Sequence, residues 1–380
     1  MLSMHIAIVG GGIGGLCTAV ALAQQNINVT VFESAASFKP IGAGIGIGSN
    51  AMQALVELGV GAQLTTNGTV LKTQIFKDAT GKILNTIDFS KLQTLYGQMN
   101  ITIQRADLHR ILFEKLPVGC IKFNKKCVKI TQLEHSCILY FSDGSHTISD
   151  YIIAADGIHS TIRQQLLPSS ITRYAGYTCW RGIADNKDFI APDTSTELWH
   201  ASGRFGYAPL SHDKIYWFAC VNAQPHDEFL KRLEKEQIAS IFHQFPNVVK
   251  QIILATPPNT ILHHDLYDLK PLKTFHYTRV LLLGDAAHAT TPNMGQGAGQ
   301  AIEDALCFAQ LLQRSTSFDE AAQQYDQQRV RKTARVTRLS RQIGQAAQWT
   351  NPIATATRDF LFPFTPSSLL LKRLKFLYKR

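Results

Sequence analysis

A group of glycines at residues 10–15 is the first part of the sequence that could do chemistry. Gly10, Gly12 and Gly15 have the spacing GxGxxG and follow a short apolar run at residues 5–9. In a strand–turn–helix unit such glycines permit a tight turn, a close approach to a pyrophosphate and close helix packing, while the positive helix N-terminus favours phosphate. Glu33 ends the next apolar run, where it can accept hydrogen bonds from ribose hydroxyls. The segment predicts a dinucleotide site without distinguishing NAD from FAD. Its residues are Gly10, Gly12, Ile13, Gly14, Gly15 and Glu33.

Two later turns place an acidic residue directly after an apolar run. Asp156 follows residues 151–155, and Gly284-Asp285 follows residues 279–283. Ligands of α/β sheets lie at the carboxyl ends of the strands, so both turns are expected at one site. Asp285 would bond a ribityl hydroxyl. Residues 295–297 would open a helix whose free N–H groups face the N1–C2=O edge of a flavin and stabilise its anionic reduced form. The dinucleotide is therefore predicted to be FAD, with these further contacts: Asp156, Gly284, Asp285, Gly295, Gln296 and Gly297.

With these three motifs in this order, the chain resembles the FAD-dependent aromatic hydroxylases of the p-hydroxybenzoate hydroxylase superfamily along nearly its whole length. Residues 173–182 (RYAGYTCWRG) and 292–297 (PNMGQG) are most similar to the branch of urate hydroxylase, salicylate hydroxylase and zeaxanthin epoxidase. The resemblance implies further FAD contacts from Arg105, from the backbone of Val128 and from Arg163. It also implies that NAD(P)H binds transiently as co-substrate, because no second Rossmann motif is present. Oxygen would then be transferred from a flavin C4a-hydroperoxide. We expect noncovalent FAD, since the motifs place no His or Cys against the flavin methyl edge.

The same resemblance implies a set of substrate contacts. In urate hydroxylases an Arg and a Tyr that match Arg204 and Tyr216 contact the substrate, and an Asp stands where this chain has Asn293 after Pro292. An amide lacks the basicity of a carboxylate near neutral pH, so urate is expected to be a poor substrate. The predicted catalytic residues are Arg204, Tyr216, Pro292 and Asn293.

Residues around Arg204 are rich in aromatic side chains, as expected of a pocket wall. Two interpretations of Arg204 stay open: a bidentate anchor for a carboxylate or carbonyl pair, or a strand-surface residue paired with an acid. Because Arg204 is remote from all three FAD motifs in the sequence, we expect its replacement to leave flavin occupancy unchanged. The neighbouring residues form either the pocket or the sheet core, and they are Trp180, Arg181, Trp199, Tyr207, Trp217 and Phe218.

No metal site is predicted. The seven cysteines are scattered without a CxxC pair, and the thirteen histidines include no HxH or HxxxH pair. Unpaired cysteines indicate a reducing, cytoplasmic location, and the apolar run at residues 6–9 is too short for a secretory signal. His288, three residues after Asp285, is either a catalytic group or a packing residue.

The positive charge of the chain is concentrated at its C-terminal end. Residues 325–380 contain twelve Lys and Arg against Asp326 and Asp359, which accounts for the whole net charge of +10. Nucleic acid is therefore not a predicted partner, because the preceding 324 residues are neutral. Basic groups beside apolar residues indicate either peripheral contact with anionic lipid or a helix docked on the enzyme with its cations in water. One helical stripe contains Arg331, Arg335, Arg338 and Arg341.

These motifs require an α/β fold with a parallel sheet. Apolar runs at 5–9, 28–32, 151–155 and 279–283 predict buried strands, and 3.6-residue periodicity predicts helices at 14–24, 50–58, 105–116, 300–312 and 320–345. Residues 171–275 predict strands with one helix near 228–245. The predicted Rossmann-type FAD-binding domain is discontinuous (1–70, 99–170 and 276–345), with an inserted β-sheet-rich substrate domain (71–98 and 171–275) and a C-terminal helical tail (346–380). No apolar run is long enough to span a membrane. Both a monomer and a homodimer stay open.

The predicted protein is an NAD(P)H- and O2-dependent flavin monooxygenase that hydroxylates a small aromatic or heteroaromatic compound. Three alternatives stay open at this point. The first is epoxidation or hydroxylation of a larger apolar molecule at a membrane surface. The others are a flavin reductase or dehydrogenase without oxygen insertion, and an FAD-binding component without turnover.

Overall fold

A six-stranded sheet in the order β18-β19-β12-β1-β2-β8 forms one end of the molecule. The computed structural model describes residues 4–38, 43–366, 372 and 374–378. Strands β19, β12, β1, β2 and β8 run parallel, and β18 pairs with β19 in the antiparallel sense. The strands are β1 (His5–Val9), β2 (Asn28–Phe32), β8 (Ile121–Lys122), β12 (Tyr151–Ala154), β18 (His276–Tyr277) and β19 (Val280–Leu282).

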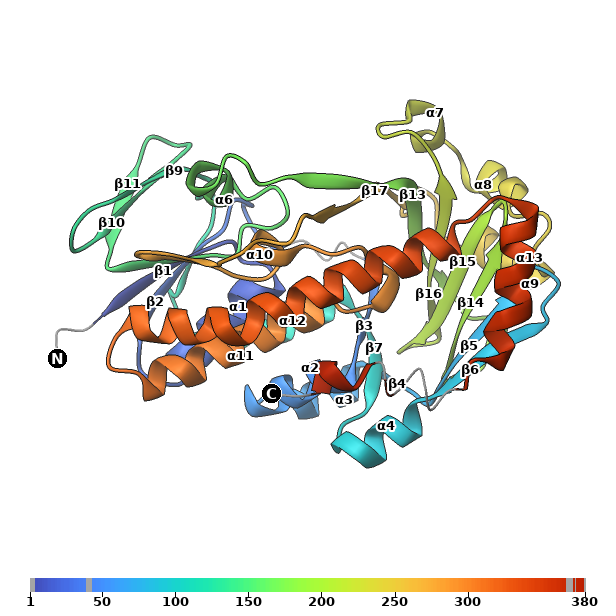
Figure 1. Ribbon diagram of the computed structural model, residues 1–380, viewed down its shortest axis with the longest axis horizontal. Coiled ribbons are helices and arrows are strands. Elements are labelled where there is room, and N and C mark those ends of the chain that lie inside the picture. The colour runs from blue at the N-terminus through green and yellow to red at the C-terminus, as the bar shows by residue number, and fades with distance from the viewer. Residues whose placement is uncertain (1–3, 39–42, 367–371, 373, 379–380) are drawn as a thin grey trace.

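Helices from residues 13–166 and from residues 285–347 pack against this sheet (Figure 1). Gly14 lets α1 approach closely, because a Cβ at this position would lie 3.1 Å from Leu283 and 3.2 Å from Ala301. The buried faces of these helices and the sheet form one apolar core. The helices are α1 (Ile13–Ala23), α2 (Ser49–Glu57), α3 (Gly61–Asn67), α5 (Arg105–Glu114), α6 (Thr161–Leu166), α10 (Asp285–His288), α11 (Gly297–Arg314) and α12 (Phe318–Ala347). The predicted α/β fold with a parallel sheet is confirmed.

A seven-stranded sheet in the order β17-β13-β16-β15-β14-β5-β6 forms the other end. Residues 73–88 supply β5 and β6 to this sheet, although they are separated from its other strands by more than eighty residues. The strands are β5 (Thr73–Asp78), β6 (Ile83–Asp88), β13 (Thr172–Asp185), β14 (Thr194–His200), β15 (Gly203–Leu210), β16 (Lys214–Asn222) and β17 (Leu262–Leu269). The domain boundaries given above stay a prediction.

One face of the seven-stranded sheet is covered by helices. Here the prediction of a single helix, near 228–245, within residues 171–275 is wrong: that segment forms α7 (Glu228–Lys231) and α8 (Lys235–Ile241), and α9 (Asn247–Leu254) follows it. Glu234 starts a new helix through a capping box with Gln237, and Pro246 stands directly before α9. Both residues are helix-start signals that interrupt a continuous helix.

Two three-stranded sheets complete the fold. One lies beside the six-stranded sheet (Figure 1) and contains β9 (Cys127–Gln132), β10 (Cys137–Phe141) and β11 (His146–Ser149). The other lies between the two ends and contains β3 (Gly44–Ile47), β4 (Thr69–Leu71) and β7 (Asn100–Gln104). Helix α4 (Phe89–Tyr96) lies near the C-terminus of the chain. The described end of the chain docks on the enzyme: Tyr378 stacks on Tyr96 with ring centroids 3.9 Å apart, and Lys332 Nζ donates to the Leu377 carbonyl at 2.8 Å.

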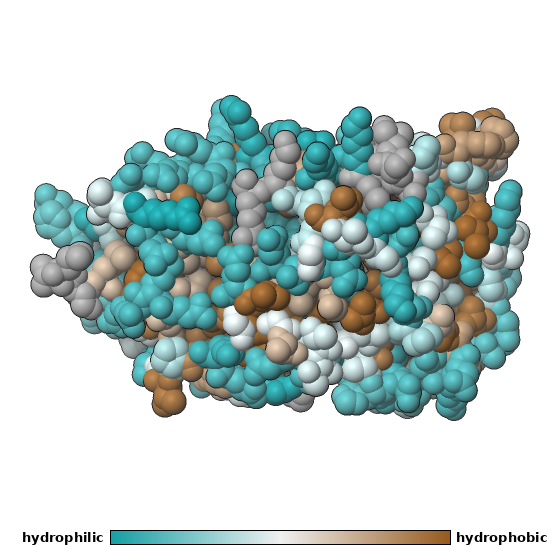
Figure 2. All heavy atoms as spheres, turned by 90° about the horizontal axis from the view of Figure 1, so that it is seen from below, coloured by the Kyte–Doolittle hydropathy of each residue, from teal (hydrophilic) through white to brown (hydrophobic). Residues whose placement is uncertain are grey.

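Helix α13 (Pro352–Leu361) lies at the right-hand end of the molecule beside β5 and β6 (Figure 1). It continues into a short 3₁₀ turn, η2 (Phe362–Phe364). Most of the face in Figure 2 is hydrophilic, and apolar side chains gather toward this same right-hand end. No helix among the described residues has the length and apolar character that crossing a membrane requires.

Candidate active site

The glycine turn between β1 and α1 leaves open space where a pyrophosphate would bind. Gly10 adopts φ +103°, and a Cβ on Gly15 would lie 1.9 Å from the Gly10 carbonyl oxygen, so both glycines are required by the protein itself. Gly12 is different, because a Cβ there would meet no protein atom within 4 Å. No side chain caps α1, which begins at Ile13, and the amides of its first turn therefore face this space. The turn fits a phosphate-bearing ligand.

The turn before α11 presents a second uncapped helix N-terminus. Pro292–Met294 form a 3₁₀ turn, Gly295 ends it in the left-handed region (φ +61°), and α11 starts at Gly297 without a side-chain cap. The side chain of Gln296 is buried and accepts a hydrogen bond from Asn50 Nδ2 at 3.0 Å, so Gln296 is left with its backbone for a ligand. This geometry suits the predicted contact with the flavin N1–C2=O edge.

The two acidic turns meet at the carboxyl ends of β12 and β19. Gly284 adopts φ +61° and caps α10, whose first residue is Asp285. The Asp285 side chain is exposed to solvent, yet the protein that surrounds it desolvates its carboxyl and raises its pKa. Asp285 therefore lines a cleft rather than the outer surface. Burial also raises the pKa of Asp156, whose Oδ1 has no hydrogen-bond partner among the described residues. A ligand hydroxyl would satisfy that oxygen.

Arg163 joins these two turns to each other. Its side chain is buried and donates to the carbonyls of Ile158 at 2.6 Å and Ala286 at 3.1 Å. The direct FAD contact stays a prediction, and these bonds make Arg163 a positioning residue for both Asp156 and Asp285. Val128 lies close by on β9: burial, and to a smaller degree the charge of Asp156, raises the pKa of the adjacent Cys127 thiol to about 11.

Glu33 and Arg105 flank the glycine turn. Glu33 Oε2 accepts from the Gly11 amide at 2.8 Å and Oε1 from the Ala35 amide at 2.7 Å, so this carboxylate fixes the turn while keeping lone pairs for a ribose. Arg105 is exposed and makes no ion pair with any described residue. It lies close enough to Asp285 to offset part of the rise in the pKa of that carboxyl. An exposed guanidinium between two cofactor turns fits the anionic part of FAD.

The substrate face of the seven-stranded sheet is aromatic. Tyr177, Tyr216 and Phe218 lie on the face opposite the helices, whereas Trp180, Tyr207 and Trp217 pack in the core beneath α8 and α9. Arg181 pairs with Phe218 and Trp199 with Arg204, so these residues also lie on the substrate face, and strand alternation thus divides the six candidates between pocket and core. Glycines admit the rings: a Cβ on Gly44 would lie 2.5 Å from Tyr216, and one on Gly206 would lie 2.2 Å from Phe218.

Tyr216 is partly buried, and its hydroxyl makes no hydrogen bond to any described residue. Burial raises the pKa of this phenol, which therefore stays protonated at physiological pH. A protonated phenol can donate to an oxo group or accept from a hydroxyl group of a bound ring.

Arg204 is neither a surface residue nor remote from the cofactor turns. Its side chain is only 2% exposed, and its guanidinium pairs with Glu197 at 3.2 Å and donates to Asn293 Oδ1. Asn293 lies two residues before Gly295. Arg204 is therefore not a strand-surface residue, and it does not lie away from all FAD motifs. Both premises are wrong, because folding brings β15 against the turn before α11.

Asn293 is held on all sides. Its Nδ2 donates to Thr291 Oγ1 at 2.9 Å and to the Ser340 carbonyl at 2.8 Å, and it also contacts the Tyr177 hydroxyl at 2.9 Å. Helix α12 approaches so closely that a Cβ on Gly344 would lie 2.3 Å from Nδ2. Asn293 therefore fastens the turn of Pro292 to α12 and to the sheet.

Sequence reasoning missed two features of this face. Glu197 is the diagonal neighbour of Arg204 on the hairpin of β14 and β15, and the two-residue loop at 201–202 was the signal that could have revealed it. Arg181 Nη2 lies 3.2 Å from Nδ1 of the exposed His264, and Arg181 has no acidic partner among the described residues. Burial lowers the pKa of His264, and the charges of Arg181 and Arg105 lower it further. The cleft therefore contains uncompensated positive charge.

His288 is a packing residue rather than a group in the cleft. It is buried, and its Nε2 lies 2.5 Å from Asp304 Oδ2. Asp304 also accepts from Arg329 at 2.6 Å and from the Gly284 amide at 3.1 Å. This buried cluster clamps α11 and α12 to the turn of Asp285.

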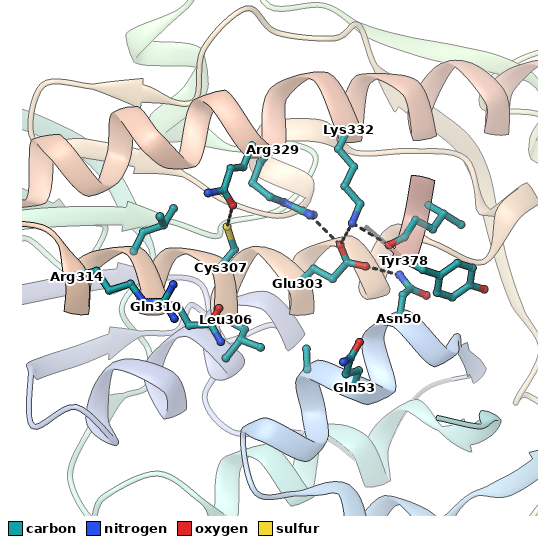
Figure 3. A pocket seen from close by; sticks show the side chains of 14 residues that line it. Asn50, Gln53, Glu303, Leu306, Cys307, Gln310, Arg314, Arg329, Lys332 and Tyr378 are labelled. Atoms are coloured by element: carbon teal, nitrogen blue, oxygen red, sulfur yellow. Dashed lines mark hydrogen bonds and ion pairs between the residues drawn. The ribbon is translucent and has the colours of Figure 1, made fainter. Parts of the chain in front are cut away.

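A cavity of about 130 Å³ lies between α2, α11, α12 and the docked C-terminal segment (Figure 3). Glu303 is central to it, accepting from Asn50 at 2.5 Å and from Lys332 at 2.8 Å. Through Asn50 the cavity borders the turn of Gln296. Arg329 and Lys332 both pair with Glu303 in this cavity, and no three potential metal ligands cluster among the described residues.

Comparisons with known proteins agree with this geometry. The model of the FAD binding domain family matches residues 3–340. The aurachin C monooxygenase/isomerase of Stigmatella aurantiaca is 33% identical over 358 residues, which cover 94% of this chain and 93% of the relative. The FAD-dependent urate hydroxylase of Klebsiella pneumoniae is 30% identical over 329 residues, 86% of each protein.

Solved structures give the same result. HpxO of Klebsiella pneumoniae, complexed with FAD and uric acid, superposes with a TM-score of 0.91 at 25% identity over 99% of this chain and 96% of that one. The prediction of FAD as the cofactor is confirmed by the family match together with the open, uncapped cofactor turns. The chain therefore belongs to the FAD binding domain family and, within it, to the FAD-dependent monooxygenases.

Proposed function

We propose that the protein hydroxylates a small aromatic or heteroaromatic compound, with NAD(P)H as the electron donor and O2 as the oxygen source. The observation that carries this proposal is the Tyr216 hydroxyl, which makes no hydrogen bond to any described residue and lies on the same sheet face as Phe218 and Tyr177. Phe218 is its aromatic neighbour, with ring centroids 6.3 Å apart, so a flat ring would find apolar contact and one directional polar contact. Both similar relatives named above are monooxygenases, which supports oxygen insertion.

FAD, when bound, supplies the electron transfer and the activation of O2. Gly12, the first turn of α1, Asp156, Asp285 and the α11 N-terminus would hold it. The remaining work of the protein is to orient the ring and to exclude water. Tyr216 would orient the oxygen substituent of the ring and keep its own proton throughout the physiological range, because burial raises its pKa. The buried Arg204–Glu197 pair and Asn293 would hold the cofactor turn against the substrate face.

The charge of Arg181, which has no acidic partner among the described residues, supports a role for NAD(P)H. The donor must enter the cleft with its phosphates, and a guanidinium without an acidic partner is a suitable contact for them. We expect Arg181→Gln to raise the KM for NAD(P)H, while Arg232→Gln, a change at the exposed residue that follows α7, leaves it unchanged. Equal KM values in both variants would remove Arg181 from the donor site.

The test of the function is a substrate screen on FAD-loaded enzyme that measures NAD(P)H consumption, H2O2 release and hydroxylated product together. Oxygen insertion requires product in proportion to NAD(P)H consumed, whereas consumption with H2O2 alone for every aromatic ring tried would favour a reductase. For a substrate found in this way, Tyr216→Phe should weaken binding by about 0.5–1.5 kcal/mol, the net value of one hydrogen bond. Its flavin content should equal that of the wild type, because Phe keeps the ring packed on Gly44.

A further inference from the structure

Helix α13 has its polarity reversed relative to an ordinary surface helix. Ile353 is 78% exposed, Phe360 66% and Phe364 71%, whereas Arg358 is 7% exposed. The apolar residues of a surface helix usually face the core and its charged residues face water. Here the charged residue is inside and the large apolar residues are outside.

The exposed apolar residues form one continuous stripe. Ile353, Phe360, Leu361 and Phe364 are spaced by seven, one and three residues, which places them on one side of a helix that continues into η2. The rings of Phe360 and Phe364 are 5.4 Å apart. Apolar side chains gather at this end of the molecule in Figure 2. Four large apolar side chains on one exposed stripe indicate a binding surface rather than scattered surface residues.

Specific contacts on the inner side fix the helix in this orientation. The guanidinium of Arg358 donates to the carbonyls of Ala346 and Ala347 at the end of α12, at 3.1 and 3.3 Å, and pairs with Asp359 at 2.7 Å. Phe362 stacks on Trp199 with ring centroids 5.1 Å apart. Rotating the helix to bury the stripe would expose these partners and leave their hydrogen bonds unmade.

We infer that the α13 stripe binds the surface of an anionic lipid bilayer. A single amphipathic helix with Phe, Leu and Ile on its outer side suits shallow insertion at the lipid headgroup boundary. The electrostatic complement comes from α12, the helix that precedes α13: Arg331, Arg335 and Arg338 are exposed and form no ion pair with a described residue. A second copy of the chain, as the other occupant, is distinguished by the test below.

A short series of side-chain contacts links the segment of the stripe to the substrate face. Phe362 contacts Trp199, the indole N–H of Trp199 donates to Glu197 at 2.7 Å, and Glu197 pairs with Arg204. Binding at the bilayer would therefore bring the sheet of the substrate pocket to the lipid. This location suits an apolar compound dissolved in the membrane, and it does not depend on which reaction the flavin performs.

The test is sedimentation of the FAD-loaded protein with vesicles of phosphatidylcholine alone or mixed with phosphatidylglycerol. We expect binding to the anionic vesicles that weakens as salt screens the charge. Combining Ile353→Ser, Phe360→Ser and Phe364→Ser should weaken it by at least about 10-fold, because the inserted area is lost. Val118→Ser, a change at another exposed apolar residue, is the matched control and should bind like the wild type.

Circular dichroism, thermal unfolding and flavin content should not differ between the triple variant and the wild type, since the replaced side chains are exposed. Absence of vesicle binding by the wild type, or equal binding by the triple variant, would overturn the inference. A wild-type dimer that the triple variant converts to a monomer would assign the stripe to a second copy instead.

Discussion

Replacing Gly12 with Ala shows whether this glycine is required for the stability of the apoprotein or for the binding of FAD. A Cβ at Gly12 meets no protein atom within 4 Å, and its backbone (φ −70°, ψ −179°) is open to any residue. The apoprotein should therefore tolerate Ala, and the loss of unfolded-state freedom should raise its stability by about 0.4–1 kcal/mol. FAD binding should suffer, because the methyl group occupies the space into which the first-turn amides of α1 point.

The expected loss of affinity follows from the hydrogen bonds displaced. An N–H bond to a charged phosphate contributes about 1.5–3 kcal/mol, so losing one such bond weakens FAD binding roughly 10–150-fold and losing two abolishes practical occupancy. Gly15→Ala is the contrasting variant: its Cβ would lie 1.9 Å from the Gly10 carbonyl oxygen, so the apoprotein itself should be destabilised.

The assay combines titration of apoprotein with FAD, followed by quenching of flavin fluorescence, with thermal unfolding of each apoprotein. Gly12→Ala should unfold at or slightly above the wild-type temperature and bind FAD weakly. Purification of Gly12→Ala with normal flavin content would refute the assignment of this turn. A large loss of apoprotein stability would show that Gly12 serves the fold and not the ligand.

The remaining predictions concern the cofactor linkage, the pocket and the buried cluster. Denaturation should release yellow flavin into the supernatant, and flavin that stays with the precipitate would mean covalent attachment. Arg204→Ala should lower the free energy of unfolding in urea by about 3–5 kcal/mol, because it leaves the Glu197 carboxylate without its ion-pair partner. Contrary to the expectation from sequence, it should also lower flavin content, because Asn293 loses the hydrogen bond that Arg204 donates. Urate should be hydroxylated about 10²–10⁴-fold less efficiently than a good substrate, since Asn293 cannot act as a base, and tightly coupled urate turnover would contradict this. Burial tends to raise the pKa of Asp304, but His288 and Arg329 hold that pKa below its ordinary value. The ionised Asp304 carboxylate therefore stabilises the folded protein above about pH 4, and this contribution is lost as the pH falls. Asp304→Asn should therefore lower the free energy of unfolding by about 3–5 kcal/mol at pH 7. In the acid range, the free energy of unfolding of this variant should depend less on pH than that of the wild type.

The cofactor half was predictable because its signals are local. The strand at residues 5–9, the turn of Gly12 and the strand at residues 28–32 form one short unit whose periodicity and glycine spacing are both read from neighbouring residues. The turns of Asp156 and Asp285 follow equally distinct apolar runs. Each of these elements was predicted to within about two residues of its observed bounds.

The substrate half was less predictable because its contacts depend on register. Arg204 reaches Asn293 across 89 positions of sequence, and Arg181 meets His264 only through the antiparallel pairing of β13 with β17. No pattern of residue types fixes such pairings. The reversed polarity of α13 was missed for another reason: a buried Arg358 among exposed apolar residues contradicts the rule from which helix faces are assigned.

The order of strands in the six-stranded sheet has a consequence for how the enzyme is made. The first strand to leave the ribosome, β1, has one neighbour available almost at once in β2, but its other neighbour, β12, begins at Tyr151, and β19 begins only at Val280. At 5–20 residues per second, roughly 10–50 s separate the synthesis of β2 from that of β19. Until β12 is made, the apolar edge of β1 is without its second partner, and until residue 285 is made, the turn of Asp285 does not exist. The cofactor site is therefore complete only after about three quarters of the chain has been made, which makes FAD capture a late event and gives chaperones a long interval in which to act.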